Sequence, residues 1–174
     1  MTIPFRRKQE GKTNYKKRLR LVSSNKLRMV IRRTNKNVTV QMIEFSMQGD
    51  KVLVSAHTHE LKKYGWKGSN KNIPASYLAG LLCGVKAKKA GITEAVPDIG
   101  MRAPIKGSLV YAALKGAIDA GLNIPCSEEA LPPQDRLTGK HIENNNATKF
   151  TKSNPKEIVK NFGEVKNKIM KEGA

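Results

Sequence analysis

Phosphate recognition is the chemistry that this sequence is best equipped to perform. The first 36 residues hold thirteen Lys or Arg residues and a single acid, Glu10, which is a net +12 of the chain's formal +19. Cationic side chains that neutralise phosphates release the counterions condensed on a polyanion, and this release favours binding. We therefore interpret the start of the chain as a polyanion-binding arm, with a nucleic acid as the expected partner.

A membrane surface is the rival polyanion, and the sequence argues against it. No apolar run approaches the roughly 20 residues of a membrane span, and the arm lacks the apolar face of an interfacial helix. No apolar signal segment follows the basic start, and Cys83 and Cys126 lie far apart without a disulfide or metal-binding pattern. We expect a cytoplasmic protein that does not bind membranes.

A second candidate for anion binding lies between residues 102 and 108, at Arg102 and at Lys106-Gly107-Ser108. Free N–H groups at a helix N-terminus favour phosphate, so these residues could form an anion cradle. The order Lys-Gly-Ser and the missing second glycine differ from a nucleotide-binding P-loop, so an RNA phosphate fits better than a nucleotide. The alternative is that Gly107 and Ser108 only cap the helix.

Metal and catalytic chemistry have little support. His57 and His59 project to one face of a strand, but no third ligand lies near them in the sequence. Glu94, Asp98 and Asp119 lack a spacing that would gather carboxylates around metal ions, as a nuclease requires. We expect no enzymatic activity, no cofactor or metal, and no small-molecule substrate.

The basic groups need a scaffold, and the hydrophobic pattern predicts a sheet. Residues 27–33, 38–45 and 51–57 alternate with the two-residue period of strands and are separated by turns. They should form an antiparallel three-strand meander. Residues 92–99 are expected to be a fourth strand, which Pro97 places at an edge of the sheet.

Two helices are expected to cover this sheet. Residues 75–90 and 109–120 each carry an apolar stripe with helical spacing, and each stripe ends at a glycine. On the first strand, Arg28 and Arg32 alternate with buried-type residues and give it a cationic face. The sheet should therefore begin inside the basic zone.

This order of elements predicts a single layered α/β domain with a mixed, mostly antiparallel sheet and two packed helices, over residues 25–124. The basic arm occupies residues 1–24 before it. Residues 125–174 form a C-terminal extension, with an irregular, proline-containing extended segment followed by a helix.

Two features leave two interpretations open. Tyr64 and Trp66, in the cationic loop 62–72, could stack on bases or fasten the loop to the core. The C-terminal helix, with Pro155 at its first position, could pack on its own domain or on a neighbouring macromolecule. Its apolar stripe consists of Ile158, Phe162, Val165 and Ile169.

Four longer motifs carry a resemblance to a known family. They are Arg-Lys-Gln-Glu-Gly-Lys-Thr-Asn-Tyr (7–15), His-Glu-Leu-Lys-Lys-Tyr-Gly-Trp (59–66), Ala-Ser-Tyr-Leu-Ala-Gly-Leu-Leu (75–82) and Ala-Leu-Lys-Gly-Ala-Ile-Asp-Ala-Gly-Leu-Asn-Ile-Pro (113–125). In this order and spacing, residues 5–142 resemble the large-subunit ribosomal protein eighteen family in its archaeal form.

The resemblance implies a structural ribosomal protein without a reaction of its own. It implies binding to 5S ribosomal RNA and to the large-subunit ribosomal RNA, contact with the neighbouring large-subunit protein five and other ribosomal proteins, and residence on the cytoplasmic ribosome. A nonspecific nucleic-acid-coating protein and a nuclease are the alternative classes that the composition leaves open.

The resemblance also implies which residues contact RNA. In the arm these are Arg6, Arg7, Lys8, Lys12, Tyr15, Lys16, Lys17, Arg18 and Arg20. At the start of the sheet they are Lys26, Arg28, Arg32 and Arg33. In the family's RNA-facing loop they are Lys67, Ser69 and Asn70, and Lys106, Gly107 and Ser108 match the turn before its last core helix.

Overall fold

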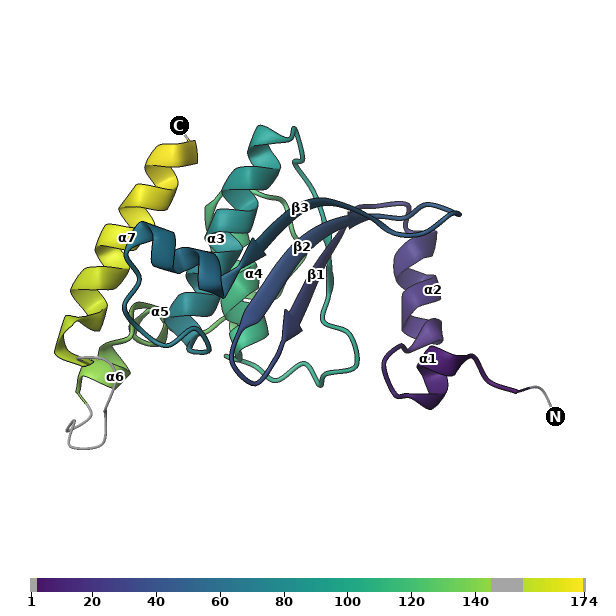
Figure 1. The fold of residues 1–174 in the computed structure, drawn as a ribbon, viewed down its shortest axis with the longest axis horizontal. Helices are drawn as coiled ribbons and strands as arrows, with labels where there is room; N and C mark the ends of the chain where they lie inside the picture. The colour runs from purple at the N-terminus through teal and green to yellow at the C-terminus, as the bar shows by residue number, and fades with distance from the viewer. Residues whose placement is uncertain (1–2, 145–154, 174) are drawn as a thin grey trace.

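The computed structural model describes residues 3–144 and 155–173 of the 174-residue chain. A group of helices packs on one side of a central sheet, and two short N-terminal helices stand on the other side (Figure 1). The first and the last of the described helices therefore lie far apart. Within the described residues, no helix is both long and apolar enough to cross a membrane. The predicted layered α/β architecture is confirmed.

The sheet has four strands in the order β3-β2-β1-β4. β1 (Arg28–Arg33), β2 (Val38–Glu44) and β3 (Lys51–His57) form the predicted antiparallel meander. β4 (Val96–Asp98) pairs with β1 in parallel and is shorter than predicted. Pro97 lies in this edge strand, because a proline has no N–H to donate to a second neighbour.

Helices α3 (Ile73–Lys89) and α4 (Leu109–Asp119) match the two predicted helices. The side chain of Asn72 caps α3 by accepting a hydrogen bond of 2.8 Å from the N–H of Ala75. Thirteen of the seventeen residues of α3 are buried, because the sheet, α4 and the C-terminal helix all pack around it. α3 is therefore the centre of the hydrophobic core.

Glycines set the distance between α3 and α4. A Cβ atom at Gly80 of α3 would overlap the carbonyl oxygen of Ala113 of α4, and one at Gly116 of α4 would overlap the carbonyl oxygen of Tyr77 of α3. The two helices thus touch through their backbones, at positions where any side chain would separate them.

The C-terminal helix packs on its own domain. A short 3₁₀ turn, η3 (Pro155–Glu157), leads into α7 (Ile158–Gly173); the predicted start at 153–154 lies outside the described residues. The ring of Phe162 lies 5.5 Å from that of Tyr77 on α3. All four residues of the predicted stripe are buried: Ile158, Phe162, Val165 and Ile169. The first of the two interpretations is confirmed.

The aromatic residues of the cationic loop face the protein. Trp66 is only 4% exposed and belongs to the core, and its Nε1 donates a 3.2 Å hydrogen bond to the carbonyl of Ser69. Tyr64 ends the 3₁₀ helix η1 (Thr58–Tyr64), and its hydroxyl donates to Glu172 of α7 at 2.6 Å. Burial together with this bond raises the pKa of Tyr64 to about 12. Trp66 therefore fastens the loop, and it is not free to stack on bases.

α7 also holds the backbone of this loop. Asn161 donates through Nδ2 to the carbonyl of Gly65 at 2.8 Å, and its Oδ1 accepts from the N–H of Lys67 at 3.1 Å. Lys168 donates to the carbonyl of Tyr64 at 3.2 Å. The C-terminal helix thus positions the loop that carries Lys67, Ser69 and Asn70.

The N-terminal arm is helical, although its sequence has no apolar periodicity. α1 (Arg6–Gln9) and α2 (Tyr15–Ser23) contain no buried residue. Asn14 caps α2 by accepting from the N–H of Lys17 at 3.1 Å. The capping residue Asn14 therefore sets the start of α2. The sequence of α2 has no apolar stripe, because the helix buries no apolar face.

Residues 125–144, predicted to be extended, contain three short helical turns: η2 (Glu128–Ala130), α5 (Gln134–Thr138) and α6 (Lys140–Glu143). Leu137 anchors them in the core with 2% exposure. The turns are too short to show a helical period in the sequence.

Replacing Gly80 by Ala should destabilise the fold by about 1–3 kcal/mol, because the new methyl group forces α3 and α4 apart. Urea unfolding at 25 °C measures the change. Gly163→Ala in α7 is the matched control, since nothing lies within 4 Å of its added Cβ. It should stabilise the protein by up to about 1 kcal/mol through helix propensity. Equal effects at both positions would refute the close helix contact.

Replacing Asn161 by Ala should loosen the loop, because two hydrogen bonds to its backbone are lost, each worth about 0.5–1.5 kcal/mol. Trp66, the only tryptophan of the chain, reports on this loop. Acrylamide should quench its fluorescence more strongly in the variant than in the wild type. Lys160→Ala, one residue earlier at an exposed position, should leave the quenching unchanged.

Candidate nucleic-acid interface

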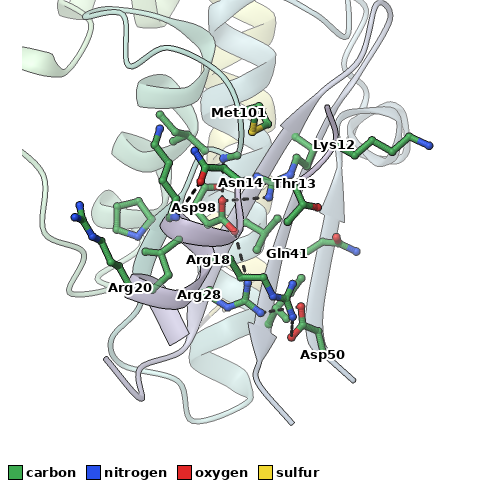
Figure 2. A pocket seen from close by; sticks show the side chains of 18 of the residues that line it. Lys12, Thr13, Asn14, Arg18, Arg20, Arg28, Gln41, Asp50, Asp98 and Met101 are labelled. Carbon is green, nitrogen blue, oxygen red and sulfur yellow. Dashed lines mark hydrogen bonds and ion pairs between the residues drawn. The ribbon is translucent and has the colours of Figure 1, made fainter. Parts of the chain in front are cut away.

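A groove of about 520 Å³ lies between α2 and the sheet (Figure 2). Val30, Gln41 and Ile43 line it, whereas Met29 and Ile31, which alternate with Val30 along β1, belong to the helix-covered core. Alternate residues of a strand project to opposite faces. The groove therefore occupies the face of the sheet that α3 and α4 leave open.

The groove is strongly cationic. Two acids, Asp50 and Asp98, also line it. Its seven Lys and Arg residues come from the arm and from β1: Arg7, Lys12, Lys17, Arg18, Arg20, Arg28 and Arg32. All seven were predicted RNA contacts, so the fold gathers charges from two parts of the sequence around one concave surface. Such a surface concentrates polyanions by focusing the positive potential.

Arg28 was expected to face outward and contact RNA, but its side chain is buried. Its side chain is 3% exposed, and its guanidinium lies 2.8 Å from a carboxylate oxygen of Asp50 and 3.6 Å from one of Asp98. A buried charge has to be compensated by close partners, which explains this arrangement. Arg28 directs its charge to these acids, and this conformation does not present it to an RNA.

Two half-exposed arginines complete this cluster. Arg18 of α2 donates to Asp50 at 2.9 Å, and Arg32 of β1 donates to the side chain of Asp98 at 3.1 Å and to its carbonyl at 2.8 Å. Partial burial alone would raise the pKa of Asp50, but the contacts with Arg28 and Arg18 outweigh it and lower that pKa. Asp50 is therefore a carboxylate at neutral pH.

The remaining predicted cations of the arm are at the surface. Tyr15 is partly buried, and its ring lies 5.0 Å from that of Phe5. Glu10 pairs with Arg6 at 2.8 Å and Lys12 at 2.7 Å. Among the predicted contacts of the arm and of the start of the sheet, the exposed cations outside the groove are Arg6, Lys8, Lys16, Lys26 and Arg33, of which Lys26 pairs with Glu94 at 2.9 Å. They extend the positive surface beyond the groove.

The predicted loop residues do not join the groove. Lys67 and Ser69 are exposed and Asn70 is partly buried. Their loop lies against α7, on the helix side of the sheet, while the arm lies on the other side (Figure 1). The structure thus has two separate candidate surfaces for RNA.

The predicted anion cradle needs a correction. The N–H of Gly107 donates to the carbonyl of Ala130 at 2.9 Å, and that of Ser108 donates to Ile105 at 3.3 Å. Lys106 pairs with Glu129 at 3.1 Å. Gly107 thus donates to η2 and Ser108 to its own loop, so neither N–H is free for a phosphate. Ser108 is the N-cap residue of α4 but makes no side-chain cap bond, and Arg102 is exposed nearby.

His57, His59 and Cys83 have structural surroundings. No group of three His, Cys, Asp or Glu side chains in the part of the chain that the structure describes could hold a metal ion. His57 accepts a 3.1 Å bond from the N–H of His59 and so caps η1. Cys83 is buried, and burial raises its pKa to about 12, which leaves it an unreactive thiol.

Sequence reasoning missed the uncharged and acidic members of the groove. Gln41 alternates with Val40 and Met42 along its strand, and this alternation could have assigned it to the same face of the sheet as Arg28 and Arg32. Asp50 and Asp98 had no such signal, because their partners lie tens of residues away in the chain.

Comparison with known proteins confirms the resemblance. The model of the protein family described as "Ribosomal large subunit proteins 60S L5, and 50S L18" matches residues 1–96. The large ribosomal subunit protein uL18 of Korarchaeum cryptofilum (strain OPF8) is 54% identical over 140 residues, which cover 80% of this chain and 72% of that protein. The chain therefore belongs to this family of large-subunit ribosomal proteins, as a structural component of the cytoplasmic ribosome and not as an enzyme.

Proposed function

We propose that this protein binds 5S ribosomal RNA through its arm and groove, and helps attach that RNA to the large-subunit ribosomal RNA. The observation that carries the proposal is the groove between α2 and the sheet, which seven cationic side chains line, all of them except Arg28 at least partly exposed. Membership in the ribosomal family restricts the polyanion to RNA.

Attachment of one RNA to another requires two binding surfaces. The groove and the arm provide the first, and the loop with Lys67, Ser69 and Asn70 provides the second on the other side of the sheet. We assign 5S ribosomal RNA to the groove because the groove has more cationic side chains than the loop has. Large-subunit ribosomal RNA, the neighbouring large-subunit protein five and other ribosomal proteins are the proposed partners of the remaining surface.

The groove is suited to reading the RNA backbone and its shape. Arg and Lys side chains bind phosphates without reading sequence, and folded RNA is recognised largely by shape and phosphate geometry. Trp66 takes no part in base stacking, since it is buried. Tyr15 and the neighbouring Phe5, which is 71% exposed, are the aromatic groups of the arm that an unpaired base can reach.

The salt dependence of binding tests the phosphate contacts. If about six to eight phosphates are neutralised, the slope of log affinity against log salt should be about −4 to −7. Lys16→Gln with Lys17→Gln should weaken binding to 5S RNA and reduce this slope by about two, because two phosphate contacts are lost. Fluorescence anisotropy with labelled 5S RNA measures both quantities.

The matched control is Lys160→Gln with Lys171→Gln, which removes the same charge at exposed positions of α7, away from the arm. It should change the slope much less. A slope near zero for the wild type, or equal effects of the two double variants, would contradict a binding surface in the arm.

Competition distinguishes specific recognition from nonspecific coating. Labelled 5S RNA should stay bound in the presence of an excess of transfer RNA, because shape-specific contacts add to the general attraction between charges. Unlabelled 5S RNA should displace it. Equal displacement by both RNAs would show a coating protein and overturn the proposed function.

A further inference from the structure

Two carboxylates occupy a surface on which a negative charge opposes the binding of RNA. Asp50, in the turn between β2 and β3, and Asp98, at the end of β4, both line the cationic groove. Each repels a phosphate at close range. Any contribution of these two acids to RNA binding therefore has to outweigh this repulsion.

The two acids and three arginines form one row of successive ion pairs, in which positive and negative side chains alternate. Figure 2 shows Arg18 and Arg28 converging on Asp50, with Asp98 on the far side of Arg28. The order is Arg18, Asp50, Arg28, Asp98, Arg32, with N–O distances of 2.9, 2.8, 3.6 and 3.1 Å between successive members. These ion pairs join α2, the β2–β3 turn, β1 and the edge strand β4.

The middle arginine of this row of ion pairs is buried, and the arginines at its two ends are partly exposed. The side chain of Arg28 is 3% exposed, whereas those of Arg18 and Arg32 are 37% and 47% exposed. The carboxylates lie between these extremes, at 23% for Asp50 and 11% for Asp98. Each acid therefore has one buried guanidinium behind it and one accessible guanidinium in front of it.

Arg32 is held by more than charge. Besides its contacts with Asp98, Arg32 donates to the carbonyl of Ile31 at 3.0 Å. Asp98 is itself fixed by accepting a 2.8 Å hydrogen bond from the N–H of Gly100. Arg18 extends from α2, which has no buried residue. Its bond to Asp50 holds its side chain against the turn between β2 and β3. Both guanidinium forks thus have defined positions at the groove wall.

We propose that Asp50 and Asp98 are positioning residues for RNA recognition, which orient Arg18 and Arg32 toward the phosphates of the bound RNA. This inference rests on the proposed function. An arginine recognises phosphate through a planar fork of donors, and a fork that is already oriented loses less conformational freedom on binding. The acids thereby add to specificity while they lower the net attraction.

Asp50 is the member of the pair to test. Asp98 also supports the backbone at Gly100, whereas the Asp50 carboxylate has hydrogen bonds and ion pairs, among the described residues, with Arg18 and Arg28 alone. Asp50→Asn makes the protein more positive by one charge. If charge alone governed binding, this variant would bind every RNA more tightly. A loss of arginine orientation predicts the opposite for 5S RNA.

The experiment compares the full-length wild type with Asp50→Asn, Asp50→Glu and the control Glu44→Gln in binding to 5S RNA and to transfer RNA. Glu44 is an exposed acid at the end of β2, outside the groove, so its variant has the same change of charge. Asp50→Asn should weaken 5S binding about three- to tenfold, the loss expected when a long side chain must be ordered on binding. Transfer RNA binding should not weaken.

The remaining variants complete the result expected from a positioning role. Asp50→Glu should recover most of the affinity for 5S RNA, because it keeps the carboxylate. Glu44→Gln should bind both RNAs as tightly as the wild type, or slightly more tightly. The ratio of the two affinities should therefore fall in Asp50→Asn alone.

Arg18→Lys keeps the test decisive if Asp50→Asn disturbs the fold, since it retains the charge on a half-exposed side chain but removes the fork. It should weaken 5S binding severalfold with an unchanged far-UV circular dichroism spectrum. If folded Asp50→Asn and Arg18→Lys bind 5S RNA as tightly as the wild type, the positioning role is refuted and the proposed function stands. If the wild type itself shows no preference for 5S RNA, both are refuted.

Discussion

The burial of Arg28 is the constraint on which the functional side of this molecule depends. A guanidinium withdrawn from water requires carboxylates close to it, and here they come from the β2–β3 turn and from β4. One side chain thus fixes the hairpin tip, the first strand and the edge strand relative to one another. β4 pairs with β1 over only three residues, and the ion pairs of Asp98 with Arg28 and Arg32 add side-chain contacts to this short ladder.

The two faces of the sheet have separate tasks. The helix-covered face provides stability, through α3 enclosed by the sheet, α4 and α7, and through helices that meet at glycine backbones. The open face provides the cationic groove. α7 lies beyond residues 1–96, the part that the family model matches, yet it holds the loop around Lys67. The C-terminal extension therefore takes part in shaping the surface on the helix side.

The cations of the proposed RNA surface also divide into two kinds. Lys16, Lys17 and Arg20 have exposed side chains, and they suit long-range attraction that salt weakens. Arg18 and Arg32 are held by carboxylates and offer directed donors. A net charge of +19 measures the first property and says nothing about the second. In the proposed binding mode, attraction and orientation are thus supplied by different residues of one surface.

The sequence by itself determined the elements that local pattern encodes. Period-two alternation predicted the meander, apolar stripes predicted α3, α4 and α7, and the basic start predicted the polyanion surface, because these signals lie within a few neighbouring residues. Only the tertiary structure decided the burial of Arg28, whose acid Asp98 is brought beside it by the pairing of β4 with β1. It also decided that Ala130 accepts the N–H of Gly107 and that Trp66 belongs to the core. Such contacts join residues distant in the chain, and their partners are set by packing that no local spacing records.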